Sequence, residues 1–399
     1  MKIEENSLES QTPDSVENTL MVIQHSTHLP INIEPIISRK WVLNGNNNSN
    51  WQMYQDAFED SPTNSSIIKG TVEYIFADGL IDLNGDSDIQ KEFNVSKHLS
   101  ASDAKLICND YKKFGGFAVQ VIWNSAKDIK DKRPLLVKYF KIFKLGLSID
   151  ECMEVNGYWY SFDWSKYGKY KPVYYPMYTG EYKGNDVELI VFQQPTSNDF
   201  FAQPDYVSAI RYAQIEGELQ NWAYNHLLNG FQGSVLINVN GGVPATEELR
   251  RRYRKELLGN TTGSINAGKA IVSFNKSKEQ AIDVITIPVL DLNQQYVQMS
   301  TDSREQLIAA HQASPVIFAN TKDGSGLGNN SEEMEMATKA MYRKVIRPMQ
   351  KDILTHLMTI FKDIENPVKD EYGNIIYKKI ELGFKDFESF NKDNRDDLK

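Results

Sequence analysis

The chain has 399 residues, of which 41% are hydrophobic and 24% charged, a composition typical of folded globular proteins with room for more than one lobe. Its formal net charge of −9 argues against a general nucleic-acid binder, because affinity for duplex DNA ordinarily comes from lysine and arginine side chains that neutralise phosphates. The sequence contains no apolar run of the length that crosses a membrane, and its N-terminus, MKIEENSLES, has neither the basic start nor the apolar centre of a signal peptide, so we expect a protein made and used in a cytosol.

The N-terminal half predicts a loose arm followed by helices and a sheet. Residues 1–30 are polar, acidic and without periodicity, which predicts a flexible arm. Helices are predicted over Trp51–Phe58, from Ser61 to a turn at Asp78-Gly79, and over Ser100–Phe114. Strands are predicted over Phe117–Trp123, Leu135–Phe143, Gly157–Asp163, Pro172–Met177 and Val187–Gln193. Together these strands predict an antiparallel sheet.

A long helix and a small inserted lobe follow. Asp205 caps the helix and Asn229-Gly230 closes it, and polar residues interrupt its apolar stripe, so the helix needs more than one kind of neighbour. Two strands and a capped helix come next, at Val235–Val239, Ala270–Phe274 and from Thr246 to Gly259. Residues 232–287 therefore predict a compact αβ lobe inserted between helices.

The remaining chain predicts two helices on either side of a glycine-rich loop. Asn293–Ser314 is helical by spacing, and Pro315 ends it because the residue before a proline avoids the α conformation. After the loop Ala319–Ser331, a helix carries an apolar stripe from Met334 to Phe361, with a kink expected at Pro348. Ile375–Leu382 then alternates like a strand, and the tail from Lys385 is charged.

This order of elements resembles the core of the portal proteins of tailed bacteriophages. The resemblance rests on PDYVSAIRYAQIEGELQNWAYNHLLNGF, SINAGKAIVSF, REQLIAAHQASPVIF and KDGSGLGNNSEEMEMATKAMYRKVIRP, and more loosely on GGFAVQVIWN and GYWYSFDW before them. It implies an α+β subunit with an antiparallel-sheet wing, long stem helices, a small αβ clip lobe, and a long kinked helix after a tunnel loop. The implied divisions are a flexible arm (1–30), the wing (31–204), a stem helix (205–231), the clip (232–287), a second stem helix (288–318), the tunnel loop (319–331), a long wing helix (332–365), and a C-terminal strand and tail (366–399) with the crown reduced or absent.

The resemblance implies a mechanical role in a virion. A portal subunit would form a homododecameric ring at one capsid vertex and pass double-stranded DNA during genome packaging, retention and ejection. It would contact terminase, the major capsid protein and then the neck or tail connector proteins, after assembly in the host cytoplasm, with no membrane and no cofactor. The net charge of −9 suits a conduit, because an acidic wall does not hold phosphates.

Two groups of residues are the candidate sites. The resemblance places the glycine loop in the channel of the ring, with Asn320, Thr321, Lys322, Asp323, Gly324, Ser325, Gly326 and Gly328 as its channel residues. The G-x-G-x-G spacing without a following Gly-Lys-Ser/Thr argues against a phosphate-binding loop. The densest basic cluster contains Arg250, Arg251, Arg254 and Lys255. It is either a solvated helix face or, as part of a clip, a docking surface for the packaging motor and the neck proteins.

No set of residues predicts catalysis or metal binding. The histidines lie apart, His25 and His28 in the arm and His226, His311 and His356 on separate helices, where we expect core or interface positions. Cys108 and Cys152 are expected to be buried small hydrophobes rather than a disulfide. We therefore predict no enzymatic activity. The alternatives are an enzyme that binds a phosphate-bearing ligand at the glycine loop, and a monomeric glycan-binding protein that uses the tyrosine-rich strands from Tyr158 to Tyr182.

Overall fold

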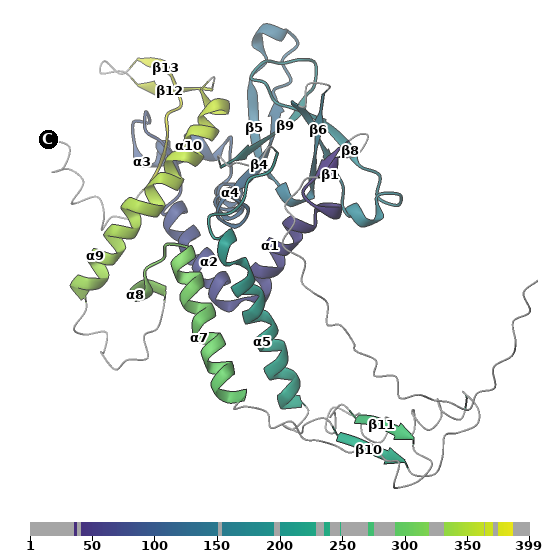
Figure 1. Ribbon diagram of the computed structural model, residues 1–399. Helices are drawn as coiled ribbons and strands as arrows, with labels where there is room; N and C mark the ends of the chain where they lie inside the picture. Colours follow the sequence, from purple (N-terminus) through teal and green to yellow (C-terminus); the bar gives the residue numbers. More distant parts are fainter. Residues whose placement is uncertain are drawn as a thin grey trace, which may run out of the picture.

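The computed structural model describes residues 36–37, 41–150, 154–194, 200–228, 235–239, 248, 270–274, 292–318, 331–362, 364–369 and 374–385. These residues form a mixed helical and sheet structure, which confirms the expected α+β class. None of the described helices is long and apolar enough to cross a membrane. Figure 1 shows two long helices, α5 and α7, extending from a body of sheets and shorter helices, with the strands β10 and β11 beyond their far ends.

Three helices form the helical layer of that body. Helices α1, α2 and α4 span Ser49–Asp60, Pro62–Phe76 and Ala101–Phe114, close to the predicted ranges. The hydroxyl of Ser61 accepts a hydrogen bond from the N–H of Asn64 at the start of α2, and Ser100 accepts one from Asp103 at the start of α4. The inward sides of these helices join the two sheets in one hydrophobic core, in which Ile107 is fully buried.

Two antiparallel sheets form the other side of the core, where the sequence predicted one. The first sheet has the order β1-β2-β6-β7-β8, with strands Ile36–Ile37, Val42–Leu43, Leu145–Ile149, Val155–Tyr160 and Val173–Pro176. The second has the order β5-β4-β9, with strands Pro134–Phe140, Gly116–Trp123 and Val187–Gln193. Two predicted strands are too long: β5 stops at Phe140 because a 3-10 turn, Ile142–Lys144, follows, and β7 stops at Tyr160.

The two sheets pack face to face through aromatic side chains. The ring centroid of Phe140 in β5 lies 5.3 Å from that of Tyr160 and 5.6 Å from that of Tyr175. The hydroxyl of Tyr158 in β7 accepts a hydrogen bond of 3.3 Å from the N–H of Val191 in β9. One face of the five-stranded sheet is therefore part of the core.

The two long helices run side by side (Figure 1). Helix α5 spans Ile210–Leu228 after a 3-10 turn, Val207–Ala209, and helix α7 spans Leu292–Ala310. The predicted end of α7 at Ser314 is wrong, because the chain turns at Gln312, which has a left-handed backbone (φ 52°). Pro315 begins a short helix, α8 (Pro315–Phe318), since proline fits the first helical position. Strands β10 (Val235–Val239) and β11 (Ala270–Phe274) are where the sequence predicted them and pair in parallel.

Helical residues continue without a break from Ser331 to Phe361. Helix α9 (Ser331–Met341) is followed by a π-helical turn, Tyr342–Ile346, and by α10 (Arg347–Phe361). Pro348 lies in the first turn of α10, directly after the π turn. Proline has no N–H, and its ring meets the carbonyl four residues earlier in a regular helix, so we attribute the π turn to Pro348. The predicted apolar stripe is buried from Met341 to Phe361, whereas Met334 is exposed.

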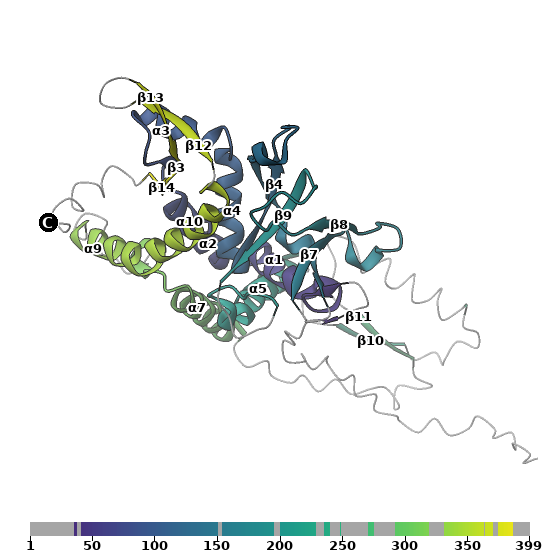
Figure 2. The same ribbon diagram turned by 90° about the horizontal axis from the view of Figure 1, so that it is seen from above.

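The C-terminal residues fold back onto a small lobe near α2. This lobe contains β3 (Leu80–Asp82), α3 (Asp88–Ser96), β12 (Glu365–Lys369), β13 (Ile375–Lys379) and β14 (Leu382–Phe384), with β14 paired to β3 and β12 paired to β13. The sequence predicted neither α3 nor β12. Pro367 was expected before the last strand, but it lies inside β12, opposite Tyr377. The view in Figure 2 places this lobe and α9–α10 on the opposite side of the molecule from β8.

Asp82 joins three segments of this small lobe. Its carboxylate is fully buried. Oδ1 accepts hydrogen bonds of 3.1 Å from the N–H groups of Asn84 and Glu381, and Oδ2 accepts one of 2.8 Å from Nδ2 of Asn94 in α3. A single carboxylate therefore holds β3, α3 and the start of β14 together.

We expect Asp82→Ala to destabilise the protein by about 3 kcal/mol, because it leaves buried donors without an acceptor. Urea denaturation measures the change. Asp78→Ala, at an exposed aspartate four residues earlier, is the control and should change the free energy of unfolding by less than about 0.5 kcal/mol. Equal effects of the two substitutions would contradict this role of Asp82.

Candidate functional site

The start of α5 and the end of α7 lie together against α4, and we call this end of the helix pair its root. Five side chains, which we call the junction cluster, fix it there: Asn64, Lys112, Asp205, Tyr206 and His311. Nζ of Lys112, whose side chain is fully buried in α4, lies 2.6 Å from Oδ2 of Asp205, just before α5. The hydroxyl of Tyr206 donates a hydrogen bond of 2.9 Å to the carbonyl of Lys113. Its ring stacks on His311, which directly follows α7, with centroids 4.4 Å apart. Both long helices therefore meet α4 at one point.

His311 is held as a neutral imidazole. Its Nε2 lies 2.8 Å from Oδ1 of the buried Asn64. Nδ1 is buried and has no hydrogen-bond partner among the described residues. Burial lowers the pKa of His311 well below its ordinary value of 6.5, and the nearby ammonium of Lys112 lowers it further. Burial also raises the pKa of Tyr206 well above its ordinary value, so its hydroxyl stays a donor.

Helix α5 also caps helix α2. Glu216 of α5 accepts hydrogen bonds from the hydroxyl of Ser61, from the hydroxyl of Thr63 at 2.6 Å and from the N–H of Thr63 at 3.1 Å. Its negative charge thus lies at the positive end of the α2 dipole. A Cβ on the next residue, Gly217, would lie 3.0 Å from Cβ of Asp60, so the glycine permits this close approach.

A second contact joins α4 to the long C-terminal helix. The hydroxyl of Tyr111 donates a hydrogen bond to Oδ2 of Asp352 in α10. A cleft of about 620 Å³ opens beside this contact, lined in part by Asp205, Gln312 and Lys344. The cleft therefore lies where the root of the helix pair, α4 and the π turn meet.

Asp110 and Lys113 form a buried ionisable pair behind the junction cluster. Their charged atoms are 4.0 Å apart, and Oδ2 of Asp110 accepts a hydrogen bond of 2.8 Å from the hydroxyl of Tyr139 in β5. Burial raises the pKa of Asp110 to about 7, although Lys113 opposes the shift. Burial likewise lowers the pKa of Lys113. Desolvation therefore outweighs the mutual attraction of the pair.

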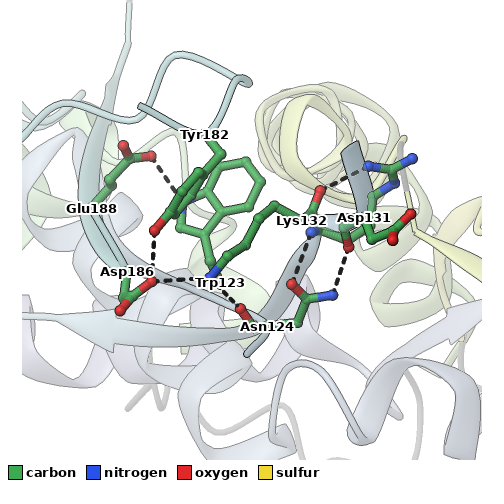
Figure 3. A network of polar contacts seen from close by, with 8 residues as sticks. Trp123, Asn124, Asp131, Lys132, Tyr182, Asp186 and Glu188 are labelled. Atoms are coloured by element: carbon green, nitrogen blue, oxygen red, sulfur yellow. Dashed lines mark hydrogen bonds and ion pairs between the residues drawn. The ribbon is translucent and has the colours of Figure 1, made fainter. Parts of the chain in front are cut away.

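A separate polar network closes one end of the three-stranded sheet (Figure 3). Nζ of Lys132 lies 3.2 Å from Oδ1 of Asp186, 2.8 Å from the carbonyl of Asn124 and 4.5 Å from the centre of the Tyr182 ring. The hydroxyl of Tyr182 donates to the same Asp186 oxygen, and this hydrogen bond, followed by the contacts of Lys132, lowers the pKa of Asp186. The positive charge of Lys132 is therefore satisfied within the chain, and the network fixes loops instead of forming an anion site.

The candidate residues named from the sequence lie outside the described residues. These are Asn320, Thr321, Lys322, Asp323, Gly324, Ser325, Gly326 and Gly328 of the glycine loop, and Arg250, Arg251, Arg254 and Lys255 of the basic cluster. His25, His28 and Cys152 also lie outside them, whereas Cys108 and His311 are buried as expected. Where the chain is described, no group of His, Cys, Asp and Glu side chains is arranged to hold a metal ion.

We expect Glu216→Ala to destabilise the protein by about 1–2 kcal/mol, because the start of α2 loses both an acceptor and a favourable charge. Chemical denaturation measures the loss. Glu218, exposed on the same helix, gives the matched control: Glu218→Ala should cost less than about 0.5 kcal/mol. If the two variants unfold at the same denaturant concentration, Glu216 is not a cap.

The junction cluster predicts a pH dependence of stability. The pKa of His311 is depressed in the folded protein. Below pH 6.5 the imidazole is therefore protonated in the unfolded chain but still neutral in the folded one. The contribution of His311 to the free energy of unfolding should therefore fall by up to about 1.4 kcal/mol per pH unit as the pH drops below that value, whereas Asp110 contributes a slope of the opposite sign. His311→Gln should remove this contribution, so the difference in the free energy of unfolding between the two proteins should change with pH, as denaturation at a series of pH values between neutral and mildly acid would reveal. Parallel curves for the two proteins would contradict the prediction.

Comparisons with known proteins found similarity in structure alone. No protein-family model matches the chain, and no curated protein does. A chain in the neck of an empty gene transfer agent particle, computed with C6 symmetry, is 13% identical with a TM-score of 0.53, over 92% of this chain and 90% of that one. A chain in the neck of the native particle, computed with C12 symmetry, is 14% identical with a TM-score of 0.50, also over 92% and 90%.

A phage portal protein of the HK97 family from Corynebacterium diphtheriae is 10% identical over 81% of this chain and 94% of that one, with a TM-score of 0.41, which is too low to support an argument. The two similarities to particle necks cover nearly the whole of each chain. At such low identity they concern the fold and not the function. The chain has the fold of proteins found in the necks of gene transfer agent particles.

Proposed function

We propose that the protein is a portal, the ring-shaped DNA gateway at one vertex of a phage-like capsid. The observation that carries the proposal is the similarity of fold over 92% of the chain to a protein in a particle neck. In the proposed subunit α5 and α7 are the stem, the two sheets belong to the wing, and the lobe around β10 and β11 is the clip. The role is mechanical and needs neither a cofactor nor a catalytic group.

Exposed apolar side chains on the helix pair support ring assembly. Trp222 and Tyr224 of α5 are 37% and 63% exposed, and Val297 and Met299 of α7 are 61% and 45% exposed. Within one subunit Trp222 stacks on Tyr296 across the pair, with ring centroids 5.5 Å apart. Side chains of this kind on both helices favour a neighbouring pair on each side, as in a closed ring of twelve copies.

The proposed channel residues belong to the glycine loop. The loop 319–331 joins α8 to the start of α9, and its glycines permit backbone conformations that other residues avoid. In a portal, Lys322 and Asp323 form the charged tip of this loop beside passing double-stranded DNA. The net charge of −9 favours sliding over binding, because the wall would not neutralise phosphates.

The proposed docking surface is the basic cluster of the clip. Arg250, Arg251, Arg254 and Lys255 would bind acidic surfaces of terminase during packaging and then of the neck or tail connector proteins. Exposed charges of this kind set association rates and partner choice more than affinity. The proposal also includes contact with the major capsid protein, assembly in the host cytoplasm, and a role in genome retention and ejection within the virion.

Electron microscopy of the purified full-length protein tests the proposal. We expect ring-shaped particles with a central hole, with residues 319–331 nearest the axis and Arg250 near one end of the ring. Mass photometry at micromolar concentration provides an independent check. A stable, well-folded monomer of 45.6 kDa would overturn the proposal. A ring with residues 319–331 on its outer rim would overturn only the channel assignment.

A further inference from the structure

The five-stranded sheet is apolar on both faces. The inner face packs on the three-stranded sheet through Tyr158, Tyr160 and Tyr175. An antiparallel sheet with one solvated face normally places polar side chains on that face. Here the opposite face is lined by five aromatic side chains, Trp41, Trp159, Trp164, Tyr167 and Tyr174, which we call the outer aromatic face.

The rings of the outer aromatic face pack against one another, and two of them remain open to solvent. Trp41 lies 5.8 Å from Trp159, 5.4 Å from Trp164 and 6.0 Å from Tyr167 between ring centroids. Tyr167 is nevertheless 54% exposed and Tyr174 44% exposed. A Cβ on Gly157 would meet the hydroxyl of Tyr174 at 2.3 Å, so this ring lies flat along the sheet and offers a broad surface. Such a surface is typical of a face that another segment covers.

One donor on the outer aromatic face lacks an acceptor. Nε1 of Trp159 is buried and has no hydrogen-bond partner within the described residues. The indole N–H of Trp164, which follows β7, has an acceptor: it donates a hydrogen bond of 3.0 Å to the carbonyl of Lys144. A buried N–H group ordinarily finds a partner.

The edge of this face is positively charged. Lys166, Lys169 and Lys171 lie in the turn between β7 and β8, and we call them the lysine rim. Lys166 lies 3.5 Å from Asp163, and Nζ of Lys169 lies 5.2 Å from the centre of the Tyr170 ring. The turn between β7 and β8 carries these three lysines and one aspartate, so its net charge is positive. The covering segment should therefore be acidic as well as apolar.

We propose that residues 1–35 of the same chain cover the outer aromatic face, with their acidic side chains at the lysine rim. These residues contain six acidic side chains and one lysine, and they include the apolar run Leu20 to Ile23. They lead directly into Ile36 of β1, which is an edge strand of this sheet. A chain of that length can span up to about 3.3 Å per residue, so the face is well within its reach.

Carbodiimide crosslinking of the full-length protein tests the proposal, because this reagent joins a lysine to a carboxylate only where the two touch. The sample is an equal mixture of unlabelled and ¹⁵N-labelled chains. We expect mass spectrometry to find links from Lys166, Lys169 or Lys171 to acidic residues among 1–35, within chains of one isotope. Lys138, exposed on the other sheet, is the internal control and should form no such links.

A charge-reversal variant gives a second readout on the full chain. Replacing the three rim lysines by glutamate should increase the rate at which a glutamate-specific protease cuts within residues 1–35 by on the order of ten-fold, because a docked segment resists cleavage. The same replacement at Lys127, Lys130 and Lys138, which are also exposed, is the matched control and should leave the rate unchanged.

The remaining outcomes would overturn the proposal in distinguishable ways. Links between chains of different isotopes would assign the face to the N-terminal residues of a neighbouring copy. An absence of links together with unchanged cleavage would exclude these residues as the occupant. If duplex DNA shields the rim lysines from acetylation while no links form without it, the face binds nucleic acid. The proposal does not depend on the portal assignment, and a monomer tests it equally well.

Discussion

The ion pair between Lys112 and Asp205 is the contact on which the placement of the long helices depends. The side chain of Lys112 is fully buried, so loss of Asp205 would leave an uncompensated charge in the core, at a cost of about 3–5 kcal/mol. Asp205 directly precedes the turn into α5, and Tyr206 beside it stacks on His311 at the end of α7. One buried charge pair and one ring stack thus set the direction of both helices relative to α4.

The buried ionisable groups around this contact respond to pH in opposite senses. His311 has a depressed pKa, so its contribution to stability is lost as the pH falls below 6.5. Asp110 has a pKa raised from 3.8 to about 7, so the folded state holds an extra proton between these values and loses stability as the pH rises through them. In mildly acid solution, His311 and Asp110 therefore change the free energy of unfolding with pH in opposite directions. His311→Gln would therefore leave the slope that Asp110 imposes.

The sequence predicted best those helices whose ends are marked by capping residues. Ser61 and Ser100 are N-caps, and both mark helix starts in the structure. Strand β12 was missed because Pro367 argues against a strand, yet its paired position opposite Tyr377 in a two-stranded hairpin tolerates it. The junction cluster was also missed, since Asn64 and His311 are 247 residues apart. In the sequence, Lys112 and Lys113 stand among the apolar residues that end α4, without a sign of the partners that they contact.

The contacts along α5 divide the helix pair into a fixed end and a free end. Asp205, Glu216 and Gln220 all bind the body, the last through a hydrogen bond of 3.0 Å from its Nε2 to the carbonyl of Asp60. Beyond Gln220, Trp222 of α5 stacks on Tyr296 of α7, and Tyr224 is mostly exposed. Polar contacts with strict geometry thus orient the end of the pair that adjoins α4, whereas exposed apolar side chains lie toward the tip. This division fits the proposed ring, in which the body of each subunit would set the angle of its helix pair and neighbouring copies would pack against the exposed apolar side chains.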